Sequence, residues 1–136
     1  MQLTLIKNDD EHKIAVYKIA RIIYAETSAS SLSAVEALAC MIGNLCQKSL
    51  RQLSDIANDK NIFESLNENS SRHCELSVDG TSEKFQMCLR AAQKMSNGKL
   101  PDSVRGATRF HRVDLMPDWA VSIGSVAEID GLSFYS

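Results

Sequence analysis

Apolar residues recur at the spacing of an α-helix in three stretches of the chain. These stretches are residues 12–26, 33–46 and 82–95, and a serine-rich break at 28–31 separates the first two. In each stretch the apolar positions return every three or four residues, which is typical of a helix that buries one face. The pattern therefore predicts three substantial helices in the first two thirds of the chain.

Local signals suggest where these helices begin and end. The polar residues 8–10 are candidate N-caps for the first helix, and Ser33 with Glu36 forms the pattern of a capping box for the second. Asn97 and Gly98 form a typical stop signal after the third. Between residues 47 and 79 the periodicity is weak, and it supports only a short helix near 50–57.

The last third of the chain has a different pattern. Residues 106–111 are led by glycine and are expected to form a strand beside a site, and residues 117–119 should start a turn or short helix. The segments 126–129 and 132–135, joined by Asp130-Gly131, indicate a β-hairpin. We therefore expect a mainly helical α+β fold with a small antiparallel sheet in the C-terminal third.

Composition narrows the class of protein. The 136 residues suit a single domain over 1–136, and a net charge of -2 argues against binding nucleic acid through a basic surface. No apolar run approaches the roughly 20 residues of a membrane span, and the N-terminus lacks the pattern of a signal peptide. The four cysteines form no C-x-x-C pair, and nucleotide-binding glycine motifs are missing. We predict no metal and no cofactor, and we expect a monomer.

Glu26 is the most informative single position. It continues the apolar stripe of the first helix and lies near the C-terminal end of that helix. Burial and the negative end of the helix dipole both favour the protonated carboxyl, which a proton donor near neutral pH requires. The alternative is a glutamate at a frayed helix end whose carboxylate reaches solvent.

Several motifs, taken in order, resemble one family. Ala20-Arg-Ile-Ile-Tyr-Ala-Glu26 is followed by Asn44, and Gly106-Ala-Thr-Arg-Phe-His111 is followed by Pro117-x-Trp119-Ala120 and by a closing Phe134-Tyr135. This order and spacing is similar to that of SleB-type cell wall hydrolases, which cleave peptidoglycan. The resemblance covers some 80 residues, in about 17–46 and 85–135, while the stretch between is poorly matched.

The resemblance implies a lysozyme-like domain that cuts peptidoglycan between N-acetylmuramic acid and N-acetylglucosamine, in the bacterial cell wall or periplasm. Members of the family are understood as lytic transglycosylases, which leave a 1,6-anhydro end. Glu26 matches the catalytic glutamate and would act first as acid and then as base. No second acid stands at a matching motif position, which favours a scheme with a single carboxyl group.

Six other residues are candidates for binding the sugar chain. Tyr24 and Thr108 could supply hydroxyls near Glu26, Trp119 and Tyr135 could offer flat faces to sugar rings, and Arg109 and His111 should share one face of a strand. For His111, Arg109 and Trp119 a purely structural or solvent-facing role is an equal alternative.

The chain departs from the family pattern at three polar positions. Ser30 replaces a second glutamate, Arg109 replaces a histidine after the Gly-Ala-Thr segment, and Leu132 replaces a histidine near the end. Two alternatives to an active enzyme follow. One is a weakened or inactive module that binds glycan or a partner protein, and the other is a helical domain without any connection to the cell wall.

Overall fold

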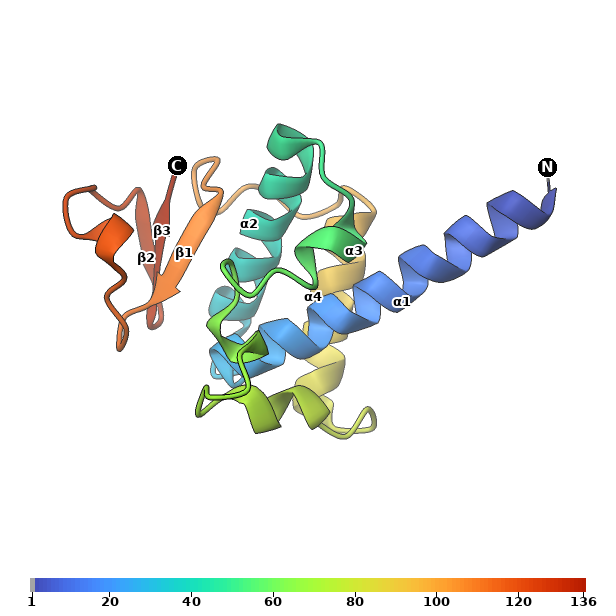
Figure 1. Ribbon diagram of the computed structural model, residues 1–136, viewed down its shortest axis with the longest axis horizontal. Coiled ribbons are helices and arrows are strands. Elements are labelled where there is room, and N and C mark those ends of the chain that lie inside the picture. The colour runs from blue at the N-terminus through green and yellow to red at the C-terminus, as the bar shows by residue number, and fades with distance from the viewer. Residues whose placement is uncertain (1) are drawn as a thin grey trace.

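Four helices followed by a three-stranded sheet make up the fold (Figure 1). The computed structural model describes the backbone of residues 2–136 and the side chains of residues 10–136. The helices are α1 (Gln2–Thr27), α2 (Leu32–Ser49), the short α3 (Leu53–Ile56) and α4 (Glu83–Ser96). Two 3-10 turns, η1 (Glu64–Leu66) and η2 (His73–Ser77), lie in the weakly patterned region between α3 and α4. In the part of the chain that the structure describes, no helix is long and apolar enough to cross a membrane.

Two predicted helix starts are wrong. Helix α1 runs through residues 8–10 without interruption, because the preceding residues 2–7 include good helix formers that continue the helix backwards. Helix α2 is capped by Ser31 and not by Ser33: the Ser31 hydroxyl accepts a hydrogen bond of 3.1 Å from the backbone amide of Ala34. The same hydroxyl donates to Asp130 in the hairpin turn at 2.7 Å, so the cap also ties the two ends of the fold together.

The remaining helix predictions agree better with the structure. Helix α4 has Ser82 as its N-cap and Asn97 as its C-cap, and Gly98 follows with a φ of +69°, as the stop signal indicated. The short helix expected at 50–57 is limited to α3, because Leu50 has a φ of +57° and ends α2 in the left-handed conformation.

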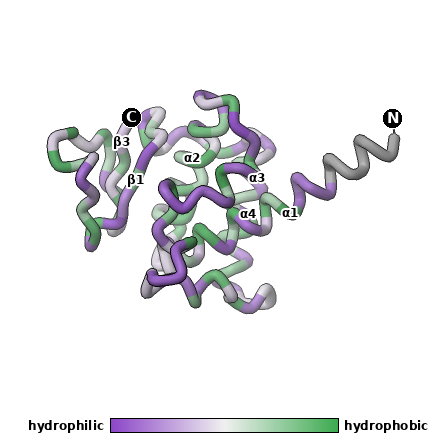
Figure 2. Tube along the Cα trace, viewed as in Figure 1, coloured by the Kyte–Doolittle hydropathy of each residue, from purple (hydrophilic) through white to green (hydrophobic). Residues whose placement is uncertain are grey.

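The core lies where α1, α2 and α4 meet, and the hydrophobic segments in Figure 2 lie along these helices. Helix α1 packs chiefly against α4, and α2 contacts both the other helices and strands β1 (Arg109–Arg112) and β2 (Ala127–Ile129). The fully buried side chains include Ile19, Ile23, Leu38, Met41, Ile42 and Phe85. Helix α2 is thus the element that joins the helical core to the sheet.

The sheet has the strand order β1-β3-β2 and is antiparallel throughout. Strand β3 (Leu132–Tyr135) lies in the middle, and Phe110 of β1 pairs with Phe134 of β3. Asp130 and Gly131 have φ values of +42° and +89° and form the tight turn of the predicted hairpin. The mainly helical α+β fold with a small antiparallel sheet is therefore confirmed.

Contacts from the helices fix the position of β1. The Asn44 amide of α2 donates to the carbonyl of Ala107 at 3.1 Å, and the Lys48 ammonium donates to the carbonyl of Gly106 at 2.5 Å. On the same side, the ring of Phe63 lies 6.0 Å from that of Phe110. These contacts hold the strand at the distance from α1 on which the candidate site depends.

Candidate active site

A cleft of about 400 Å³ lies between the end of α1, the segment around η1, and β1 with the turn that follows it. This turn includes the 3-10 helix η3 (Asp118–Ala120). The residues that line the cleft are Glu26, Lys60, Asn61, Ile62, Glu64, Asn67, Phe110, His111, Arg112, Leu115, Met116, Pro117 and Trp119. Its volume falls within the range of about 300–1,000 Å³ that is usual for sites that hold small molecules.

Glu26 lies on the inner side of this cleft. Its side chain is only 1% exposed, so the expected burial is confirmed and the alternative of a carboxylate reaching solvent is wrong. One carboxylate oxygen, Oε1, accepts a hydrogen bond of 2.7 Å from Nη1 of Arg112. The other, Oε2, accepts one of 2.9 Å from the backbone amide of Ser65. The buried carboxylate therefore has a cation and a neutral donor as partners, neither of which the sequence predicted.

Arg112 connects several acidic groups. Besides Glu26, its guanidinium donates from Nη2 to Glu64 at 2.7 Å, and Nε lies 3.4 Å from Asp114 without forming a hydrogen bond. Burial lowers the pKa of Arg112, but the carboxylates of Glu64 and Glu26 outweigh this effect and raise the pKa above its ordinary value. The side chain is 5% exposed and carries its charge inside the protein.

Glu64 is the second carboxylate in the cleft. Its Oε1 accepts hydrogen bonds of 2.7 Å from both Ser70 Oγ and Arg112 Nη2, and its side chain is 37% exposed. Although burial raises the pKa of Glu64, these hydrogen bonds and the charge of Arg112 together hold it below its usual value. Sequence reasoning missed this residue because it lies in the region without helical or strand periodicity, where a glutamate looks like any solvated side chain.

His111 belongs to a cluster with two aromatic residues. Its Nδ1 lies 2.8 Å from the carbonyl oxygen of Arg112 and donates to it, and its Nε2 forms a hydrogen bond of 2.8 Å with the Tyr135 hydroxyl. Trp119 packs edge-on against both rings. The guanidinium of Arg109 lies 5.0 Å from the centre of the Trp119 ring. This cluster forms one end of the cleft wall.

The structure brings only some of the predicted site residues to the cleft. Glu26, His111 and Trp119 line it. Tyr135 and Arg109 contact the rings of the cluster but are not among the lining residues. The expected shared face of Arg109 and His111 is confirmed, because both side chains contact the ring of Trp119, although Arg109 is exposed and His111 is buried.

The two predicted hydroxyl donors do not line the cleft either. Tyr24 is half-buried and packs against the hydrophobic core, because residues two apart on a helix point in different directions and Glu26 faces the cleft. Thr108 precedes β1, and its backbone amide donates to the carbonyl of Tyr135 at 2.9 Å. Two positions at which the chain departs from the family pattern, Ser30 and Leu132, also do not line the cleft. Ser30 is exposed, and Leu132 is buried in the hydrophobic core.

The chemistry that this arrangement allows is proton transfer. Glu26, Arg112 and Glu64 together carry one more negative than positive charge, and the exposed Asp114, 3.4 Å from Arg112, adds another. Because Arg112 keeps Glu64 as a partner, the protonation of Glu26 does not leave the buried guanidinium without a counter-charge.

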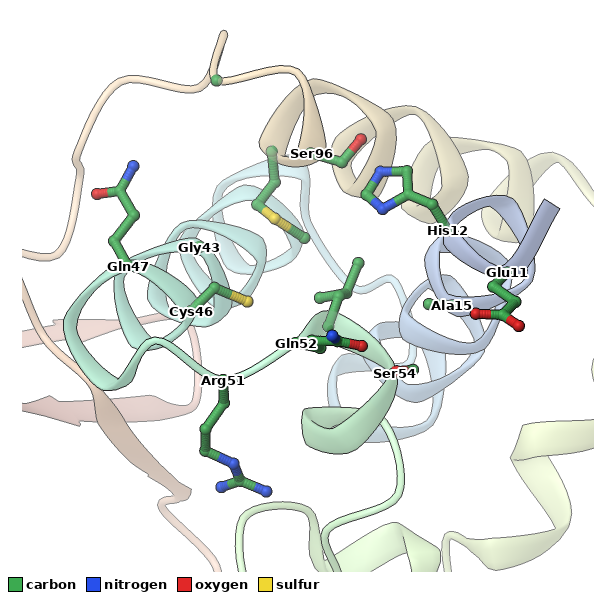
Figure 3. A pocket seen from close by; sticks show the side chains of 13 residues that line it. Glu11, His12, Ala15, Gly43, Cys46, Gln47, Arg51, Gln52, Ser54 and Ser96 are labelled. Carbon is green, nitrogen blue, oxygen red and sulfur yellow. The ribbon is translucent and has the colours of Figure 1, made fainter. Parts of the chain in front are cut away.

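A second cavity, of about 530 Å³, lies among the helices (Figure 3). It is lined by residues of α1, α2, α3 and the end of α4, among them Glu11, His12, Cys46, Arg51 and Met95. Burial raises the pKa of the Cys46 thiol, so this thiol is a poor nucleophile at neutral pH. None of the motif residues between 106 and 135 lines this cavity, and we place the candidate active site in the cleft at Glu26.

No family model, curated protein or solved structure matches the chain. The functional assignment therefore depends on the geometry of the cleft together with the motif resemblance. Among the residues whose side chains are described, no group of three histidine, cysteine or acidic side chains could hold a metal ion.

Proposed function

We propose that the protein cleaves the glycan strands of peptidoglycan between N-acetylmuramic acid and N-acetylglucosamine, with Glu26 as the proton donor. The observation that carries this proposal is the buried carboxyl group of Glu26, which lines a cleft at the end of a long helix and faces a small antiparallel sheet. This arrangement is consistent with a lysozyme-like domain, and it would act in the bacterial cell wall or periplasm.

In the first step, Glu26 gives its proton to the oxygen of the glycosidic bond as the bond breaks. The muramyl ring then has oxocarbenium character, and nearby carboxylates and dipoles stabilise it. In the transglycosylase route, the ionised Glu26 takes the proton of the C6 hydroxyl of the same sugar, which attacks C1 and closes a 1,6-anhydro ring. A single carboxyl group thus acts as acid and then as base.

In this role Glu26 carries a proton, although it forms an ion pair with Arg112. The guanidinium of Arg112 lies 2.7 Å from the carboxylate of Glu26, which is 1% exposed. A neutral saccharide that enters the cleft displaces water from around these groups. Arg112 can then remain paired with Glu64 while Glu26 carries the proton.

Trp119 supplies a platform for a sugar ring. It is half-buried, lines the cleft and is held edge-on against His111 and Tyr135, which fixes the orientation of its ring. Aromatic side chains that are apolar on the face and rimmed by polar groups suit the packing of sugar rings. Asn61 and Asn67 line the same cleft and provide amide groups for hydrogen bonds to hydroxyls.

The test is the release of muropeptides from purified sacculi, followed by mass spectrometry. Glu26→Gln should lower the rate by at least about 100-fold, the contribution typical of general acid catalysis. Glu68→Gln is the matched control, because Glu68 is exposed and does not line the cleft. Equal release by wild type and Glu26→Gln would refute the role of Glu26.

One observation favours a second candidate function, a module that binds glycan without cutting it. Both carboxylate oxygens of Glu26 already have partners in Arg112 and Ser65, so the group is less available to a substrate than a free carboxyl would be. In that case wild type should bind sacculi and release no muropeptides. Trp119→Ala should then weaken binding, while Glu26→Gln should not.

A further inference from the structure

We propose that Glu64 is a second catalytic carboxylate of the cleft, which activates a water molecule and adds a hydrolytic route to the transglycosylase route. This inference rests on the proposed function and concerns the same site. Its consequence is that the protein releases two kinds of glycan end. Hydrolysis leaves a free reducing sugar, and the transglycosylase route leaves a 1,6-anhydro sugar.

The first argument is the distance between the two carboxyl groups. Glu26 and Glu64 accept hydrogen bonds of 2.7 Å each from the two Nη atoms of one guanidinium. Their oxygens are therefore separated by no more than two hydrogen bonds and the width of that group. The two carboxyl groups lie about 5–5.5 Å apart in retaining glycosidases and about 6.5–9.5 Å apart in inverting ones, where the larger separation leaves room for a water molecule.

The second argument is the difference between their environments. Glu26 is 1% exposed, whereas Glu64 is 37% exposed and reaches the solvent that would supply the water. Ser70 and Arg112 both donate to Glu64 and keep it ionised, as a base must be. Pairs of carboxyl groups whose surroundings differ in this way divide the roles of acid and base.

The other charged groups around the cleft are poorer candidates for the base. Asp114 is 63% exposed, forms no hydrogen bond to the guanidinium and does not line the cleft. Lys60 lines the cleft but is a cation. Both ring nitrogens of His111 have partners within the protein. Glu64 is therefore the group in the described cleft best suited to accept a proton from water.

The step balances as a hydrolysis. Glu64 takes a proton from water as the water oxygen forms a bond to C1 of N-acetylmuramic acid. The bond from C1 to the bridging oxygen breaks, and that oxygen receives the proton of Glu26. One water molecule is consumed, and solvent afterwards returns a proton to Glu26 and removes one from Glu64.

The decisive experiment is the ratio of the two kinds of end, which differ in mass by one water. Wild type should release both. Glu64→Gln should reduce the reducing ends formed by hydrolysis by about 100-fold or more. It should retain the anhydro ends, since a glutamine at this position still accepts hydrogen bonds from Arg112 and Ser70. Asp114→Asn, which alters the same ion-pair cluster outside the cleft, should leave the ratio unchanged.

A rescue experiment separates a chemical from a structural role. Azide attacks C1 without needing a base, so azide added to Glu64→Ala should replace the lost hydrolytic ends by muramyl azide ends, beside the retained anhydro ends. Anhydro ends alone from wild type, or an unchanged ratio in Glu64→Gln, would overturn the role of Glu64 and leave the proposed function intact. Undiminished cleavage by Glu26→Gln, or no cleavage by wild type, would instead refute the proposed function and this inference with it.

Discussion

Replacing Arg112 by methionine should destabilise the protein strongly. The substitution leaves the carboxylate of Glu26, which is 1% exposed, without its cation, and it removes one partner of Glu64. Breaking a buried ion pair on one side costs about 3–5 kcal/mol of the free energy of unfolding. A domain of 136 residues has a total of roughly 7–20 kcal/mol at the usual value per residue, so this loss is a large share.

A double-mutant cycle isolates the contribution of the pair. Glu26→Gln should cost less, about 1–3 kcal/mol, because Arg112 keeps the carboxylate of Glu64 as a partner. In the double variant, no unpaired charge remains at position 26. Its loss should therefore be smaller than the sum of the two single losses by about 1–3 kcal/mol.

Urea unfolding followed by circular dichroism gives these free energies, and pH provides an internal check. A buried carboxylate without a cation takes up a proton rather than remain charged. The deficit of Arg112→Met should therefore shrink as the pH is lowered from 7 to 5, while that of Glu26→Gln should not shrink in the same way. Additive losses, together with a deficit that does not depend on pH, would refute the reasoning.

Three further predictions concern other parts of the fold. Ser31→Ala should cost about 1 kcal/mol through the lost cap, and Ser33→Ala less than about 0.5 kcal/mol, as measured by thermal unfolding. Although burial raises the pKa of Asp102, backbone hydrogen bonds hold this pKa below its ordinary value. The stability that Asp102 provides is therefore present above about pH 4 and is lost as the pH falls further. Asp102→Asn should flatten the dependence of stability on pH in acid unfolding. Burial raises the pKa of Cys88 to about 12, so a thiol reagent at pH 7.5 should label the exposed Cys74 and spare Cys88, and a peptide map that shows the reverse would contradict this.

Local signals in the sequence were sufficient for much of the fold. The apolar periodicity located α2 and α4, and the Asp130-Gly131 pair located the hairpin, because each of these features depends on residues close together in the chain. The prediction that Ser33 caps α2 was wrong because it relied on a local pattern alone. Its pattern with Glu36 suits a cap, but Ser31 has a partner in Asp130 that no local pattern reveals.

The candidate site was predictable only in part. The position of Glu26 on an apolar stripe at a helix end was enough to predict its burial. Its partner Arg112 lies 86 residues away, and Glu64 reaches the cleft through a turn without regular periodicity. Which distant side chains meet is decided by packing, such as the contacts of α2 with the sheet, and the sequence pattern does not encode it.

The long separation between Glu26 and Arg112 has a consequence for biosynthesis. During translation Glu26 leaves the ribosome well before Arg112. Until the last strands have been made, burial of the ionised carboxylate of Glu26 lacks its cation and is unfavourable. Contacts so distant in sequence also slow folding, because the chain must close a large loop before it gains from them. The charged pair thus forms only after the strand that carries Arg112 has been made.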